Sequence, residues 1–108
     1  MDAAEHDRRL ARTSHLPHAA SFALGRALRD AGIHRSALGP GGRDVTRLAG
    51  SSPEMWADIL LDNADEVGPA LQALESQLRT IRHLVANGDH AQLRDLLAEA
   101  RGWHAEQP

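Results

Sequence analysis

The strongest pattern in this sequence is a stripe of apolar residues that recurs at alternating steps of four and three. The stripe consists of Val67, Leu71, Leu74, Leu78, Ile81 and Val85. Steps of three and four bring side chains to one face of an α-helix, so the stripe predicts a long amphipathic helix over residues 63–87. The Asn87–Gly88 pair suits the end of such a helix, and Pro69 is tolerable only near its start.

The first half of the chain also carries helical signals. A helical segment is expected from about Asp2 to Ala31, and Pro17 within it should kink the helix or divide it in two. Residues 32–42 (GIHRSALGPGG) are expected to form a loop, and residues 43–50 (RDVTRLAG) a short turn of helix.

Two further helix starts can be read from capping residues. Ser51 and Glu54 have the spacing of a capping box, with Pro53 in the first turn. Asp89 is expected to cap a last helix. Because no segment reads as a strand, the predicted fold class is all-α, with about five to six helices in one domain over residues 1–108.

The composition limits how large a core this chain can build. Aromatic residues make up 3% of the 108 residues, so the core has to consist of Leu, Ala, Val and Ile. Such a thin core often gains stability from a second copy, and the long apolar stripe suits a helical interface. We therefore expect a homodimer built mainly by the long helix and the last helix.

Charge and hydropathy exclude several classes of partner. The formal net charge is −3, which argues against nucleic-acid binding. No apolar run approaches the roughly 20 residues of a membrane span, and the segment MDAAEHDRRL carries no apolar signal sequence. Cysteine is absent, which excludes disulfides and thiolate catalysis. We expect a cytoplasmic protein without a membrane partner.

Two histidines flank a proline in residues 12–22 (RTSHLPHAASF). Asp7, Ser14 and His18 share a predicted helix face, and His15 lies beside them. Histidines three residues apart without a paired acidic motif do not indicate a metal site, whereas a pocket for an anionic or hydroxylated ligand needs less special geometry. Ordinary half-exposed histidines are the alternative. No arrangement of nucleophile, base and acid can be recognised, so catalytic residues stay unknown.

A second polar constellation lies in the segment GPGGRDVTRLA. Its glycines precede a short helix, which suits backbone amides that face an anion, but the spacing is not that of a P-loop and no strand precedes it. Asp44 stands three residues before Arg47 and can orient its guanidinium to bind a carboxylate through two parallel hydrogen bonds. The alternative is a surface ion pair of little value. Trp56 is expected to be mainly a core residue.

Together these segments resemble a known family. HDRRLARTSHLPH followed by GGRDVTRLAGSSPEMWADILLDN is similar to the C-terminal helical domain of prephenate and arogenate dehydrogenases. These enzymes make the precursor of tyrosine by NAD(P)-dependent oxidative decarboxylation. The resemblance runs from about His6 to Arg101, and it implies an intertwined helical dimer that binds a prephenate-like or aromatic carboxylate.

The resemblance also implies roles for individual residues. The His-Leu-Pro-His segment of the family lines the substrate side of the active-site cleft, and the position of His18 contacts the aromatic substrate or the inhibitor tyrosine. Arg47 corresponds to a residue that binds a substrate carboxylate, and Asp7 and Trp56 match positions that gate or border the pocket. The predicted substrate-binding residues are therefore Asp7, Ser14, His15, His18, Asp44, Arg47 and Trp56.

The sequence departs from the family in two ways. The family usually has an aromatic residue between its glycine pair and Arg-Asp, whereas Gly42 is followed directly by Arg43. The Gly-rich turn that binds the dinucleotide and the catalytic histidine belong to a nucleotide-binding domain that these 108 residues lack. We therefore expect no NAD(P) cofactor in this chain unless a separate nucleotide-binding domain supplies it.

Two origins stay open for such a chain. It is either a piece of a full dehydrogenase or a stand-alone protein. A stand-alone homodimer would bind a small biosynthetic intermediate or catalyse a non-redox step on it, such as decarboxylation, isomerisation or cyclisation. A purely structural dimerisation module is a third possibility.

Overall fold

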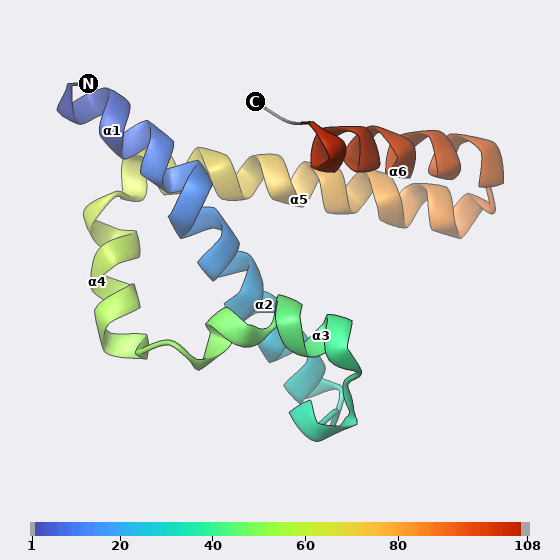
Figure 1. Ribbon diagram of the computed structural model, residues 1–108, viewed down its shortest axis with the longest axis horizontal. Helices are drawn as coiled ribbons and strands as arrows, with labels where there is room; N and C mark the ends of the chain where they lie inside the picture. The colour runs from blue at the N-terminus through green and yellow to red at the C-terminus, as the bar shows by residue number, and fades with distance from the viewer. Residues whose placement is uncertain (1, 107–108) are drawn as a thin grey trace. The chain divides into compact units, whose positions relative to one another are not determined.

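The computed structural model describes residues 2–106, in which all regular elements are helical (Figure 1). Six α-helices lie in this part of the chain, which confirms the all-α prediction. The chain divides after Leu71 into two compact units, and each is described by itself below. Within the described residues, the helices are too short or too polar to cross a membrane.

The first unit opens with one helical segment that changes its winding in the middle. Helix α1 (Ala3–Leu10) passes through a π-helical turn (Ala11–His15) into α2 (Leu16–Asp30). Asp2 caps this segment, because its carboxylate accepts a hydrogen bond of 2.7 Å from the Glu5 amide. Pro17 was expected to kink this segment or divide it in two; the winding changes just before the proline, as a π turn, and the chain stays helical throughout.

The segment after α2 is more helical than its glycines suggested. Gly32, with φ of 76°, follows the end of α2, and a short 3₁₀ helix covers Arg35–Ala37. Helix α3 (Pro40–Val45) and a 3₁₀ helix (Arg47–Gly50) follow. The loop predicted for residues 32–42 is therefore wrong at residues 40–42, because the fixed φ of Pro40 suits the first turn of a helix.

Helix α4 (Pro53–Asp62) begins with a different cap from the one predicted. Ser52 is the N-cap, and its Oγ accepts a hydrogen bond of 3.3 Å from the Met55 amide. The capping box of Ser51 and Glu54 is therefore wrong by one residue. The reason is Pro53, which forces the residue before it into the extended conformation that an N-cap needs.

The second unit begins within α5 (Ala64–Asn87) and ends with α6 (His90–Ala105). As predicted, α5 ends at Asn87, and Gly88 follows with φ of 64°. The carboxylate of Asp89 accepts a hydrogen bond of 3.0 Å from the Gln92 amide, which confirms it as the cap of α6. The chain reverses here, and α6 runs back along the end of α5 (Figure 1).

The apolar stripe of α5 is only partly covered within the chain. Val67 is buried, and Leu71, Leu74 and Ile81 are half-buried. Leu78 and Val85 are 57% and 60% exposed. These two lie seven residues apart on one helix face, so within residues 2–106 that part of the face is left largely uncovered.

Candidate functional site

Three rings of the first unit meet between the start of α2 and α4. The imidazole of His18 is stacked on the indole of Trp56, with ring centroids 3.6 Å apart and an interplanar angle of 15°. The ring of His15 meets the same indole edge to face, at a centroid distance of 6.0 Å. His15 and Trp56 are each 8% exposed, and His18 is half-buried. We refer to His15, His18 and Trp56 as the ring cluster.

The backbone of the π turn fixes the tautomer of His18. Its Nδ1 lies 2.9 Å from the carbonyl oxygen of Ser14. Because a carbonyl oxygen can only accept, Nδ1 carries the proton in this bond. The Nε2 atom of the neutral ring is then an acceptor. Ser14 thus belongs to the site through its carbonyl group.

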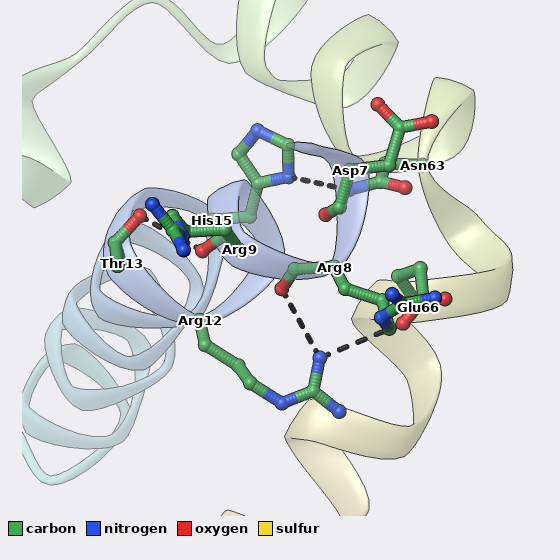
Figure 2. A network of polar contacts seen from close by, with 8 residues as sticks. All are labelled: Asp7, Arg8, Arg9, Arg12, Thr13, His15, Asn63 and Glu66. Atoms are coloured by element: carbon green, nitrogen blue, oxygen red, sulfur yellow. Dashed lines mark hydrogen bonds and ion pairs between the residues drawn. The ribbon is translucent and has the colours of Figure 1, made fainter. Parts of the chain in front are cut away.

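Asn63, the C-cap of α4, ties the π turn to the start of α5. Its Nδ2 donates a hydrogen bond of 2.9 Å to the Asp7 carbonyl oxygen and lies 3.3 Å from Nδ1 of His15 (Figure 2). Asp7 therefore contributes its backbone, while its side chain belongs to an exposed residue. The sequence analysis did not single out Asn63, although it is the last residue of the segment GGRDVTRLAGSSPEMWADILLDN. Its partner His15 lies 48 residues away, and no local pattern connects the two.

The carbonyl groups of the next two residues are also bound by side chains. Nη1 of Arg12 donates to the Arg8 carbonyl oxygen at 3.2 Å and lies 3.5 Å from a Glu66 carboxylate oxygen. The hydroxyl of Thr13 donates to the Arg9 carbonyl oxygen at 2.8 Å. Figure 2 shows these contacts around the same turn. A π turn changes the pattern of backbone hydrogen bonds, and here side chains bind the carbonyl groups beside it.

Arg47 lies apart from the ring cluster. Its Nε is 4.0 Å from an Asp44 carboxylate oxygen, and the two side chains are 70% and 81% exposed. This distance is that of a surface ion pair and is longer than a hydrogen bond. Asp44 therefore does not orient the guanidinium of Arg47 in the way the sequence predicted. Within residues 2–106 no hydrogen bond or ion pair joins Arg47 to the ring cluster.

Arg47 instead borders a pocket of about 510 Å³ between α2 and the segment that follows it. Its apolar lining includes Leu28, Ile33 and Leu38. The 3₁₀ helix of Arg47 packs closely on α2, since a Cβ placed on Gly25 would lie 3.4 Å from that of Ala49. His18 and Gly25 are seven residues apart, which corresponds to about 10 Å along the helix axis. The ring cluster and the pocket of Arg47 are thus neighbours along α2.

The site offers side chains for an organic ligand. In the described part of the chain, no three His, Asp or Glu side chains gather closely enough to bind a metal ion. What the two regions present is a stacked aromatic pair, two imidazole nitrogens and an exposed guanidinium.

Comparison with known proteins identifies the family of this chain. The sequence profile of the prephenate dehydrogenase dimerization domain matches residues 2–99. The chain belongs to the prephenate dehydrogenase family. It is 33% identical to the cyclohexadienyl dehydrogenase of Zymomonas mobilis, over 94% of this chain and 36% of that enzyme.

Solved structures of the prephenate dehydrogenase family share the same helical arrangement. The prephenate dehydrogenase of A. aeolicus, in complex with hydroxyphenyl propionate and NAD⁺, is 32% identical, with a TM-score of 0.84 over 96% of this chain and 38% of that one. The arogenate dehydrogenase of Synechocystis is 26% identical, with a TM-score of 0.86 over 96% and 40%. The chain thus spans between about a third and two-fifths of the length of these relatives.

Proposed function

We propose that this chain is the dimerization and substrate-binding part of an enzyme that acts on prephenate or arogenate. In this proposal the ring cluster contacts the six-membered ring of the ligand, and Arg47 binds a carboxylate. The observation that carries the proposal is the stacked pair of His18 and Trp56 in a chain that matches the family profile over residues 2–99. The ligand in the A. aeolicus relative, hydroxyphenyl propionate, combines a ring with a carboxylate.

The chemistry of the ring cluster suits a hydroxylated ring. Within residues 2–106 the Nε2 atoms of His15 and His18 have no hydrogen-bond partner. In the same range, the side-chain polar atom that is both fully buried and without a hydrogen-bond partner is Ser21 Oγ. The two Nε2 atoms also lack a partner, so neither of them is fully buried. Both nitrogens are therefore free to bind a ligand hydroxyl or carbonyl group.

Arg47 suits the carboxylate of the same ligand. A guanidinium offers two parallel donors to a carboxylate, which gives a stronger bond than a neutral donor does. The neighbouring pocket, at about 510 Å³, falls within the range of small-molecule sites. Because its side chain is 70% exposed, Arg47 is free to reorient toward a ligand that lies beside α2.

The homodimer is proposed from the second unit. Residues 72–108 form a unit shorter than about 40 residues, a size at which disulfides, metals or oligomerisation are usually needed for stability. The chain has no cysteine, so disulfides cannot stabilise this unit. Among its described residues, a single large apolar side chain is buried, that of Leu84. Association through the exposed face of α5 would supply the missing core.

Calorimetric titration tests the ligand proposal. Prephenate, tyrosine and 4-hydroxyphenylpyruvate are titrated into the wild-type chain and into Arg47→Ala. We expect binding of at least one ligand, weakened roughly tenfold or more in the variant, because a charge-assisted bond is worth about 1.5–3 kcal/mol. Arg9→Ala is the matched control, since Arg9 also forms an exposed ion pair at 4.0 Å. No binding at millimolar concentration would refute the proposal for the isolated chain.

A further inference from the structure

We propose that Asn63 is a positioning residue that holds the neutral ring of His15 in the tautomer with the proton on Nε2. The ring cluster then presents one hydrogen-bond donor, from His15, and one acceptor, from His18. The assignment rests on the two contacts of a single amide nitrogen (Figure 2).

The Asp7 carbonyl oxygen decides which way the Asn63 amide points. That oxygen can only accept, so the group 2.9 Å from it has to be the NH₂ and not the oxygen of the amide. The same Nδ2 lies 3.3 Å from Nδ1 of His15. An amide nitrogen has no lone pair to offer, so a hydrogen bond between these two nitrogens requires an unprotonated Nδ1 on His15.

The backbone of Asn63 is held in place by the helix that follows it. Its carbonyl oxygen accepts hydrogen bonds from the backbone amides of Glu66 at 3.1 Å and Val67 at 2.9 Å. Both amides belong to the first turn of α5. The side chain is held by the Asp7 carbonyl. His15 itself is 8% exposed and rests against Trp56. Each partner in the contact is therefore fixed before any ligand arrives.

Different groups impose opposite tautomers on the two histidines. The Ser14 carbonyl requires a proton on Nδ1 of His18, whereas the Asn63 amide requires none on Nδ1 of His15. The free Nε2 atoms are then an acceptor on His18 and a donor on His15. If the proposed function holds, this pair fits a ligand with a hydroxyl beside a carbonyl or carboxylate oxygen.

Nuclear magnetic resonance tests the tautomers without any ligand. Long-range ¹H–¹⁵N spectra of the 108-residue chain are recorded at mildly alkaline pH, where imidazoles are neutral. We expect a single Nε2–H species for His15 and Nδ1–H for His18. In Asn63→Asp the carboxylate can only accept, so His15 should switch to Nδ1–H while His18 stays as it is.

A matched control is available elsewhere in the chain. Asn87 also places its amide beside a histidine, 3.0 Å from Nε2 of His83, and both residues are exposed. Asn87→Asp makes the same change of charge and should leave His15 and His18 unaltered. An unchanged His15 tautomer in folded Asn63→Asp would overturn the proposal.

The wild-type spectrum decides the question if Asn63→Asp does not fold. A single Nε2–H species for His15 supports the proposal, and Nδ1–H or a mixture of tautomers overturns it. Ligand titrations stay separate from this readout. Absence of ligand binding would refute the proposed function and leave the tautomer result standing.

Discussion

The imidazole of His18 and the indole of Trp56 lie nearly parallel, with their centroids 3.6 Å apart. The contact joins two segments that are far apart in sequence, and it places a polar ring against one of the few buried apolar side chains of the described residues. The stack therefore serves both the packing of the first unit and the proposed ligand site.

Truncating the indole should destabilise the first unit strongly. Because Trp56 is 8% exposed, Trp56→Ala is expected to lower the free energy of unfolding by about 3–5 kcal/mol, the usual cost of removing a large buried ring. Urea unfolding at a fixed protein concentration measures this. Met55→Ala, which removes a side chain that is 53% exposed from the same helix, should cost less than about 1 kcal/mol. Equal costs would contradict the packing described.

The π turn should tolerate a change of side chain but not a change of length. Thr13→Ala removes one hydrogen bond of 2.8 Å and should cost less than about 1 kcal/mol. Inserting one alanine after Thr13 would force the turn to hold a second extra residue, which rotates α1 against α2 by about 100°. His15 or Asn63 would then lose its partner. We expect the insertion to cost more than about 3 kcal/mol in thermal or urea unfolding. An insertion variant as stable as Thr13→Ala would show that the turn does not fix the rotation of α1 against α2.

Removing the N-cap of α6 should have a smaller effect on the free energy of unfolding. Asp89→Ala should lower the free energy of unfolding by about 1 kcal/mol, because the Gln92 amide loses its partner at 3.0 Å. Asp89→Asn keeps an oxygen at the same place and should retain most of the stability. Helicity followed by circular dichroism during urea unfolding distinguishes the two variants. A loss in Asp89→Asn as large as in Asp89→Ala would argue that the charge, and not the cap, matters.

Local signals in the sequence located most helices correctly. The spacing of apolar residues and the Asn87–Gly88 pair predicted α5 to within a residue of its observed bounds, Ala64–Asn87. Asp89 was recognisable because an N-cap acts on amides only three residues away. The error at Ser51 arose where two neighbouring serines compete and Pro53 decides between them.

The candidate site was predictable only in part, because its contacts are not local. A kink or division at Pro17 was expected, but the spacing of the residues did not predict the π turn that lies just before it. Asn63 reaches Asp7 and His15 across 56 and 48 residues, which spacing alone cannot reveal. Arg47 was placed with the histidines by the family resemblance, whereas within the chain it borders a separate pocket along α2.

The isolated chain is not expected to oxidise prephenate. Hydride transfer needs a nicotinamide held against the substrate, and dinucleotide sites of this type use a Gly-rich turn between a strand and a helix. Residues 2–106 contain no strand to form one. Prephenate and NAD⁺ or NADP⁺ added to the purified chain should give no reduced nucleotide by absorbance, while a full-length family member serves as positive control. Reduction of the nucleotide at a constant specific activity through further purification of the chain would contradict this expectation.

The proposed dimer can be tested on the exposed face of α5. Leu78 is 57% exposed in the single chain, so Leu78→Glu should leave the monomer's own packing intact. If that face is the interface, the same substitution buries an unpaired carboxylate, which costs several kcal/mol. Light scattering should therefore give the mass of two 11.7 kDa chains for the wild type and a shift toward one chain for the variant.

A charge reversal at the next position provides the control for that experiment. Arg79 is exposed and lies about 100° around the helix from Leu78, so Arg79→Glu changes the net charge more but leaves the apolar face unaltered. We expect Arg79→Glu to keep the mass of two chains. A wild type with the mass of one chain would refute the dimer. A Leu78→Glu variant that stays dimeric would place the interface on another face, because an unpaired charge could not be buried there without weakening association.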